Sequence, residues 1–223
     1  MKVLTIDVGG TNVKILASGE TEPRRFPSGA MLDAASMVAQ VRDAAAGWEY
    51  DAVSIGYPGP VRNGVPIGEP FNLAAGWVDF DYAAAFGRPV KIVNDAALQA
   101  LGSYDGGKML FLGLGTGLGS AMVIDGALAP MELAHLPYRK ATFEDYVGLR
   151  GLERRGKRKW REAVADVIAR LQAALLPDYV VIGGGNAKKL KALPEGVRPG
   201  ANANAFLGGF RLWETPATAA PTM

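Results

Sequence analysis

The chain has 223 residues, of which 49% are hydrophobic and 21% charged, and its formal net charge is +2. This composition is typical of a folded protein, and so small a charge does not favour a protein that binds nucleic acid or membranes as a whole. Because it has no cysteine and a single histidine, His135, disulfides, thiolate zinc sites and cysteine nucleophiles are excluded, and oxygen ligands are expected for any metal. No apolar run approaches membrane-spanning length, so we expect a cytoplasmic protein.

The first half of the chain has the pattern of a β-β-β-α-β unit followed by a strand between two helices. Apolar residues at spacing two, bounded by turn residues, predict strands at residues 2–7, 12–18, 24–26, 51–57 and 89–93. Helical spacing predicts helices at residues 31–46, 81–86 and 95 to about 104. A loop rich in proline and glycine, at residues 57–76, lies between the β-β-β-α-β unit and the helix at residues 81–86.

The second half repeats the opening hairpin. Strands are predicted at residues 108–112, 120–124 and 179–182, and a long amphipathic helix at residues 160–175. A short helix follows Gly185, but little room remains there for a closing helix. We therefore predict two α/β lobes with a cleft between them, at residues 1–97 and 98–214, and a flexible tail at residues 215–223.

Two glycine turns, each between two predicted strands, suggest phosphate binding. They lie at Asp7-Val8-Gly9-Gly10-Thr11 and Leu114-Gly115-Thr116-Gly117. Such turns present backbone N–H groups to a phosphate, and glycine permits both close approach and positive φ, while each threonine adds a hydroxyl donor. Asp7 is predicted to hold Mg²⁺ through water. The alternative is a pair of ordinary tight hairpins. Neither a dinucleotide fingerprint nor a Walker loop fits, because a strand follows Gly119 and no Gly-Lys-Ser/Thr occurs.

Six motifs together resemble the ROK family of sugar kinases in the actin-like ATPase superfamily, most closely its polyphosphate glucokinase branch. The resemblance extends to about Glu214 and implies a two-lobed, ribonuclease H-like α/β fold with an interlobe cleft. The motifs are Ile6-Asp7-Val8-Gly9-Gly10-Thr11, Gly56-Tyr57-Pro58-Gly59-Pro60, Val93-Asn94-Asp95-Ala96, Leu114-Gly115-Thr116-Gly117-Leu118-Gly119, Glu132-Leu133-Ala134-His135 and Val181-Ile182-Gly183-Gly184-Gly185.

The resemblance implies phosphoryl transfer to the 6-hydroxyl of a hexose, with Asp95 as the catalytic base. A sugar hydroxyl is a poor nucleophile, so a carboxylate must accept its proton as the new bond forms. The implied sugar contacts are Asn94, Asp95, Glu132, His135 and Glu144. The donor would bind at Gly9, Gly10, Thr11, Gly115, Thr116, Gly117, Gly184 and Gly185. The alternatives are a helix N-cap role for Asp95 and a structural role for His135.

Two features depart from the family pattern, and a further charge pattern bears on the donor. Leu136 to Phe143 stand where many members have a cysteine cluster for zinc, so no zinc is expected. Ala134 replaces the usual glycine and would be strained at positive φ. A basic run and a later lysine group predict either a track for a polyanion or a solvated helix face. These residues are Arg150, Arg154, Arg155, Lys157, Arg158, Lys159, Arg161, Lys188, Lys189 and Lys191.

The leading hypothesis is a Mg²⁺-dependent glucokinase that uses polyphosphate, ATP or both, on glucose or a related hexose. A homodimer is expected by resemblance only, and neither nucleic acid nor a membrane is an expected partner. One alternative is a sugar-binding protein with impaired catalysis, given Ala134 and the short C-terminal segment. The other is a sugar-sensing regulator, although we expect no DNA-binding module before the first strand.

Overall fold

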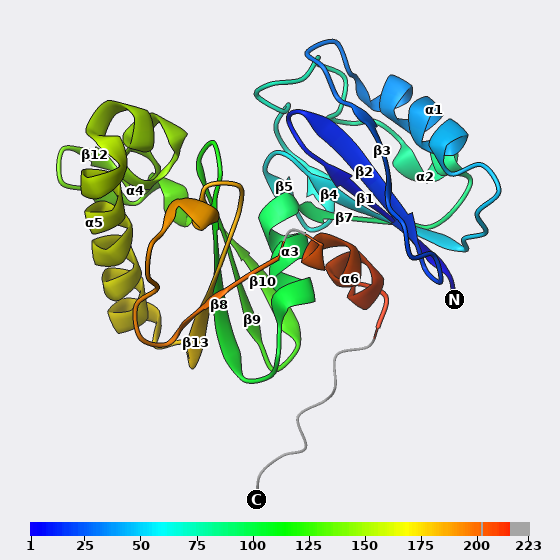
Figure 1. Cartoon of the computed structure of the whole chain (residues 1–223). Helices are drawn as coiled ribbons and strands as arrows, with labels where there is room; N and C mark the ends of the chain where they lie inside the picture. Colours follow the sequence, from blue (N-terminus) through cyan, green and yellow to red (C-terminus); the bar gives the residue numbers. More distant parts are fainter. Residues whose placement is uncertain (202, 215–223) are drawn as a thin grey trace, which may run out of the picture. The chain divides into compact units, whose positions relative to one another are not determined.

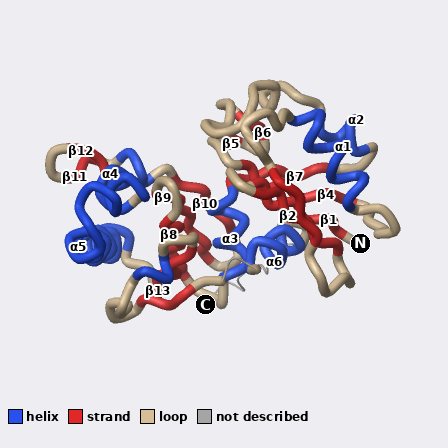
Figure 2. The backbone as a smooth tube through the Cα atoms, turned by 45° about the horizontal axis from the view of Figure 1, so that its top comes forward, coloured by secondary structure: helices blue, strands red, loops and turns tan. Residues whose placement is uncertain are grey.

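The computed structural model describes residues 1–201 and 203–214 (Figure 1). It divides into two compact units, one of Met1–Leu98 with the segment that begins at Ala205, the other of Gln99–Asn204. Figure 2 shows a main sheet with helices beside it in each unit, and each unit also has a separate two-stranded sheet. The predicted α/β class with two sheet-containing halves is confirmed. The segment from Ala205, however, joins the first unit, whereas we had assigned all of 98–214 to the second lobe; the tail predicted at 215–223 lies outside the described residues.

The sheet of the first unit has the strand order β3-β2-β1-β4-β7. β1 pairs antiparallel with β2 and parallel with β4, and β4 pairs parallel with β7, so the opening meander leads into a parallel core. The strands are β1 (Val3–Val8), β2 (Asn12–Ala17), β3 (Arg24–Pro27), β4 (Ala52–Tyr57) and β7 (Val90–Asn94). A small hairpin, β5 (Val61–Arg62) and β6 (Val65–Pro66), lies in the loop after β4.

One face of this sheet is apolar and is covered by helices α1 (Ala34–Ala44) and α2 (Tyr82–Phe86). Leu4 and Ile6 of β1 are fully buried in the same cluster as Met37 of α1, as expected for alternate residues that point to one side of a strand. Both helices begin with a capping aspartate, since Asp33 accepts the N–H of Ser36 and Asp81 that of Ala84.

The other face carries polar residues and is covered by the C-terminal helix α6 (Asn204–Arg211). Thr5 and Ser54 are fully buried there; Thr5 Oγ1 donates to the Phe206 carbonyl at 3.3 Å and Ser54 Oγ to the Gly209 carbonyl at 2.6 Å. A β-carbon on Gly209 would overlap Thr5, so glycine allows this close approach. The expectation that little room remained for a closing helix was therefore wrong, because a helix of only eight residues suffices.

The sheet of the second unit repeats the topology of the first, with the order β10-β9-β8-β13-β14. The prediction of a repeated hairpin is confirmed, since β8 and β9 pair antiparallel and β8 and β13 parallel. The strands are β8 (Lys108–Leu114), β9 (Leu118–Ile124), β10 (Ala127–Met131), β13 (Tyr179–Gly183) and β14 (Val197–Pro199). α3 (Asp95–Ser103) runs across the boundary between the two units.

Helix α5 (Leu149–Leu175) covers one face of the second sheet, and its Trp160, Val164 and Ile168 share a core with Leu110 and Ile182. It begins well before Trp160, where we had predicted its start. The difference arises because Gly156 has φ 73 and interrupts the helical pattern, so that two helical segments meet there. The remaining elements are η1 (Leu133–His135), β11 (Pro137–Tyr138), β12 (Ala141–Thr142), α4 (Phe143–Val147) and η2 (Ala187–Lys189).

Candidate functional site

The first glycine turn, Gly9–Thr11, joins β1 to β2 in the first unit. Gly9 N–H donates to the Asn12 carbonyl at 3.1 Å, and a β-carbon on Gly9 would stand 3.0 Å from that oxygen. Gly10 and Thr11 are exposed. Neither glycine has positive φ, so the sequence analysis was wrong on this point: glycine serves close approach here. The turn leaves an exposed backbone that can receive an anion.

Asp7 and the pair Asn94-Asp95 lie at the same edge of the first sheet, where its parallel strands end. The register places Asp7 of β1 beside Gly56 of β4, and Gly56 beside Val93 of β7. A β-carbon on Gly56 would stand 3.6 Å from the Asp95 α-carbon and 2.8 Å from Leu98, so glycine lets the start of α3 pack on β4. Adjacent strands are about 4.8 Å apart, so the backbones of Asp7 and Val93, two strands apart, lie roughly 10 Å from each other across the sheet.

The start of α3 uses Asn94 as its cap. Asn94 Oδ1 accepts the N–H of Ala97 at 3.0 Å, the three-residue spacing typical of an N-cap, and Asp95 Oδ1 accepts the N–H of Ala96 at 2.8 Å. Asp95 remains partly exposed. The capping role that we had considered for Asp95 therefore belongs mainly to Asn94, and the Asp95 carboxylate sits at the start of α3.

Asp7 is buried and faces a lysine that the sequence analysis missed. Its side chain is 13% exposed, and Oδ2 lies 3.8 Å from Lys14 Nζ. Burial raises the pKa of the Asp7 carboxyl above its usual value, and the Lys14 ammonium partly offsets this shift. The signal for Lys14 was its place directly opposite Asp7 in the hairpin register. Mg²⁺ keeps several of its waters when bound to proteins, so a single carboxylate can hold it through water, with the Lys14 ammonium competing for the same oxygens.

The loop before α2 brings a further unpredicted residue to the first turn. Asn72 Nδ2 lies 3.8 Å from where a β-carbon on Gly10 would stand. Glu69 fastens this loop, because its carboxylate accepts the N–H groups of Gly76, Trp77 and Val78 at 3.1–3.2 Å. Asn72 is exposed on this loop. Its closeness to Gly10 could not be predicted from the sequence, because the two residues are about sixty positions apart and share no motif.

In the second unit, two glycine segments far apart in sequence lie against each other. These are the second glycine turn, Gly115–Gly117, and the third, Gly184–Asn186. Asn186 donates its backbone N–H to the Leu114 carbonyl and its side-chain Nδ2 to the Gly115 carbonyl, both at 2.9 Å. Gly184 has φ 83, whereas Gly115 and Gly117 do not have the positive φ that we had expected. The donor residues predicted in this unit thus form one cluster, with Asn186 as a link that the sequence analysis missed.

Glu144 lies on the second glycine turn. A β-carbon on Gly117 would overlap Glu144 Oε2, so the carboxylate occupies the space that a side chain would need. Leu149 at the start of α5 donates its N–H to the Thr116 carbonyl at 3.0 Å. Arg150 Nη2 lies 3.6 Å from Glu144 Oε1 and 3.4 Å from Asp145 Oδ1. Glu144, which was predicted to contact the sugar, thus lies against the Gly115–Gly117 turn, which was predicted to bind phosphate.

Glu132 immediately precedes the short helix η1, His135 is the last residue of η1, and both are exposed. Ser120 anchors this segment, because its Oγ donates to the Met131 carbonyl at 2.9 Å and accepts the Leu133 N–H at 3.1 Å. Ala134 is buried in η1 and is not among the described non-glycine residues with positive φ. The strain that we had considered for Ala134 is therefore absent.

A cavity of about 540 Å³ adjoins the third glycine turn. Apolar side chains form much of its wall, and lysines stand beside them. Its lining includes Ile182, Leu190, Leu193, Pro199, Lys188 and Lys191. Its volume falls in the range of small-molecule sites. A larger hollow of about 950 Å³, lined by Lys2, Trp48, Asp51 and Arg88 among others, opens at the amino ends of β1 and β4 and includes none of the motif residues.

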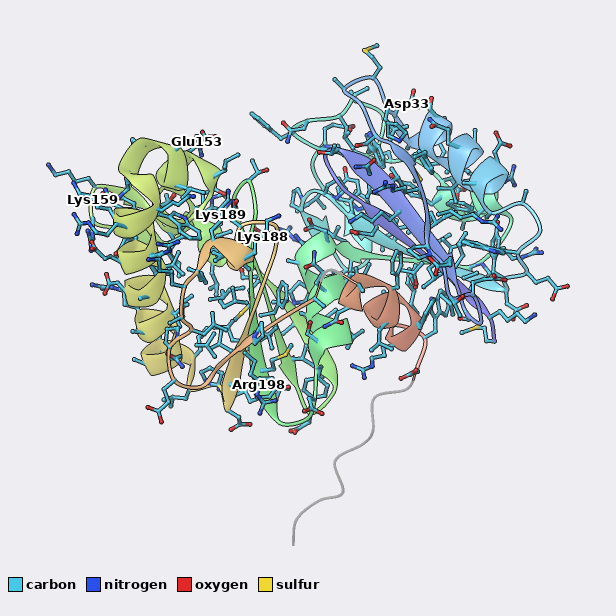
Figure 3. The ribbon with its side chains drawn as sticks, viewed as in Figure 1. Asp33, Glu153, Lys159, Lys188, Lys189 and Arg198 are labelled. Carbon is cyan, nitrogen blue, oxygen red and sulfur yellow. The ribbon has the colours of Figure 1, made fainter. Side chains whose placement is uncertain are left out.

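The basic run of α5 does not form one continuous track. The guanidinium of Arg155 lies 4.6 Å from the centre of the Tyr146 ring, and Arg158 pairs with Glu162 at 2.8 Å. Figure 3 shows Lys159 projecting from α5 well apart from Lys188 and Lys189 at η2. Several of these cations thus have structural partners, and Arg161 of α5 joins the lysine group near the third glycine turn, because its Nε–H donates to the Lys189 carbonyl at 2.7 Å.

Across 1–201 and 203–214, no group of three or more His, Asp or Glu side chains is placed to hold a metal ion. Over the same ranges, no helix has the length and apolar character needed to cross a membrane.

Comparison with known proteins agrees with this architecture. Residues 3–130 match the model of the ROK family. The polyphosphate glucokinase of Mycobacterium tuberculosis is 30% identical over 84% of this chain and 73% of its own length. That of Mycobacterium leprae is 28% identical over 84% of this chain, which spans only 60% of the relative. The crystal structure of inorganic polyphosphate/ATP-glucomannokinase from Arthrobacter sp. strain KM superposes with a TM-score of 0.78 at 25% identity, covering 93% of this chain and 96% of that one.

The family model covers more than half of the chain, the order of strands repeats in two units, and the glycine turns lie at the strand ends where the motifs predicted them. This chain belongs to the ROK family.

Proposed function

We propose that this protein is a sugar kinase of the glucokinase type, which transfers a terminal phosphoryl group from polyphosphate or ATP to the 6-hydroxyl of glucose or a related hexose. In this proposal Asp95 is the general base, and the glycine turns bind the donor phosphates. The relatives named polyphosphate glucokinase support both the sugar and the donor.

The observation that carries the proposal is the packing of the Asp95 α-carbon onto Gly56, one strand away from Asp7 and the turn that follows it. A carboxylate at the start of a helix and a glycine turn at the end of a neighbouring strand form the minimum set for phosphoryl transfer to an alcohol. Ligands of open α/β sheets bind at the carboxyl ends of parallel strands, which is where these residues lie.

The proposed reaction requires one proton transfer and one displacement. The Asp95 carboxylate accepts the proton of the sugar hydroxyl while its oxygen attacks the terminal phosphorus. The bond from that phosphorus to its bridging oxygen breaks, and the shortened polyphosphate or ADP leaves with the electron pair. Mg²⁺, held by Asp7 through water, would neutralise charge on the donor phosphates. Backbone N–H groups of the turns hold the donor's oxygens throughout.

Four side chains are proposed to position the sugar. Asn94 Oδ1 is engaged by the Ala97 N–H, so its NH₂ group is the donor that we assign to a sugar hydroxyl. Glu132, just before η1, and His135, at its end, are exposed and supply an acceptor and a second planar group. Glu144 is the fourth contact, and its carboxylate against Gly117 supports a place near the reacting phosphate.

The identity of the donor rests on two different observations. The relatives named polyphosphate glucokinase favour polyphosphate. The cavity beside Gly184 and Gly185 favours ATP, because its apolar wall suits an adenine ring and its lysines suit phosphates. We therefore propose that ATP is accepted in addition to polyphosphate.

The second candidate is a protein that binds sugar without turnover. This candidate was suggested by Ala134, which replaces the usual glycine. Because Ala134 does not have positive φ, the backbone there is not strained, and the case for impaired catalysis is weaker. Glucose-dependent thermal stabilisation without product formation would support this candidate. The homodimer and the cytoplasmic location stay predictions.

The test is a matrix of two donors against several hexoses, followed by Asp95→Asn. This variant keeps the shape of the side chain but removes the base, so kcat is expected to fall by about 10²–10⁴-fold with little change in the Kd for glucose. Asp81→Asn is the matched control, because it also alters an aspartate at the start of a helix. Full activity in Asp95→Asn would remove Asp95 from the mechanism, and no turnover with any pair in the wild type would refute the kinase.

A further inference from the structure

The position of Glu144 creates an electrostatic conflict with a bound donor. Its Oε2 lies where a β-carbon on Gly117 would stand, and its side chain is only 27% exposed. Helix α4 fixes this position, because Thr142 and Asp145 form a reciprocal capping box around the first turn that contains Glu144. A carboxylate that cannot easily move away would repel phosphates held by the same turn.

Arg150 is placed to relieve that conflict. Its Nη2 lies 3.6 Å from Glu144 and 3.4 Å from Asp145, yet its side chain is 72% exposed. Guanidinium has five N–H donors in a planar fork, and these two contacts involve only one of its nitrogens. The remaining donors can therefore serve an anion that arrives from the solvent side.

The backbone beside Arg150 is attached to the turn itself. Leu149 donates its N–H to the Thr116 carbonyl, and a β-carbon on Gly148 would stand 2.7 Å from that oxygen and 3.2 Å from the Gly117 α-carbon. The first turn of α5 thus rests on the second glycine turn. Arg150 is held within reach of the turn by the short connection through Leu149 and Gly148.

Fold stability alone gives little reason for an arginine at this position. A cation in the first turn of a helix has the unfavourable sign for the helix dipole. Exposed ion pairs also contribute little to stability. By contrast, Arg155 of the same helix packs on the Tyr146 ring, which accounts for its presence structurally.

We propose that Arg150 binds the donor phosphates at the second glycine turn and at the same time neutralises Glu144. The inference rests on the proposed function only in taking Gly115–Gly117 as the donor turn. It adds a donor-binding residue outside the glycine motifs, and it makes Glu144 compatible with a polyanionic donor.

The experiment measures binding of inorganic tripolyphosphate by titration calorimetry in the absence of sugar. Arg150→Gln is expected to raise the Kd at least tenfold and to reduce the salt dependence of binding, because one charge contact is lost. Arg150→Lys should recover only part of the affinity, since an ammonium lacks the planar fork. Arg158→Gln is the matched control, since Arg158 is 78% exposed on the same helix and also pairs with a glutamate.

Kinetics give a second and independent readout. Arg150→Gln should raise the KM for the donor by a similar factor and leave the KM for glucose within about twofold, a pattern that a folding defect would not produce. Wild-type affinity for tripolyphosphate in Arg150→Gln, an equal loss in Arg158→Gln, or no binding by the wild type would each overturn the proposal. If the wild type binds tripolyphosphate but transfers no phosphoryl group, the kinase proposal fails while that for Arg150 stands.

Discussion

The backbone of Gly184 lies directly on that of Leu114, since a β-carbon on Gly184 would stand 2.5 Å from the Leu114 carbonyl oxygen. The φ of Gly184 is 83, which disfavours any other residue. This contact joins the end of β13 to the turn after β8, and Asn186 reinforces it with two hydrogen bonds. Two glycine motifs separated by about seventy residues thus meet through Gly184 and Asn186.

Substitution of that glycine should destabilise the second unit. Gly184→Ala introduces both a steric overlap and an unfavourable φ, so we expect the free energy of unfolding to fall by about 2–4 kcal/mol. Gly185→Ala is the matched control, since nothing lies within 4 Å of its β-carbon position, and it should change stability by about 0.5 kcal/mol or less. Urea unfolding followed by circular dichroism measures both. Equal effects of the two variants would contradict the packing described here.

Removal of the Ser54 hydroxyl should weaken the attachment of α6. Ser54 Oγ donates to the Gly209 carbonyl and accepts the Trp213 indole N–H at 2.9 Å, so alanine leaves two polar groups without this partner. We expect a loss of about 1–3 kcal/mol in the free energy of unfolding and faster exchange of the Trp213 indole proton. Ser36→Ala, an exposed serine of α1, is the control. An unchanged indole exchange rate in Ser54→Ala would show that Ser54 does not hold Trp213.

Neutralisation of Asp7 should increase stability while it lowers activity. Burial raises the native pKa of Asp7 above its unfolded value, so the folded state binds the proton more tightly and stability declines as the pH rises through the native pKa. Asp7→Asn should therefore raise the melting temperature at pH 7, and the gain should shrink as the pH falls below that native pKa. If Asp7 holds Mg²⁺ for the donor, kcat falls in the same variant. A lower melting temperature at pH 7, or a gain independent of pH, would contradict this assignment.

The sequence allowed the strands and their turns to be predicted because their signals are local. The alternation in β1 and β2 and the glycines between them lie within a few residues. Helix α5 was predicted too short because its helical pattern is broken at Gly156, where the backbone leaves helical geometry. Only the segment after this break was predicted, although Leu152 before it and Trp160 after it are buried in the same core.

The candidate site could be predicted only in part, for a related reason. Asp95 and the glycine turns belong to compact motifs, whereas Asn72 and Asn186 become relevant only through contacts with Gly10 and Gly115, far away in the sequence. From the sequence, Arg150 could not be told apart from the other basic residues of its run. Its distance from Glu144 is what separates it from the others.

The discontinuity of the first unit bears on how the protein folds as it is synthesised. The ribosome releases β1 and β4 early, but the helix that covers Thr5 and Ser54 emerges only after all of Gln99–Asn204 has been made. At about 5–20 residues per second, this interval lasts roughly 5–20 s. During that time the side of the nascent sheet that carries Thr5 and Ser54 stays uncovered, so the first unit can complete its packing only after the second unit has been made.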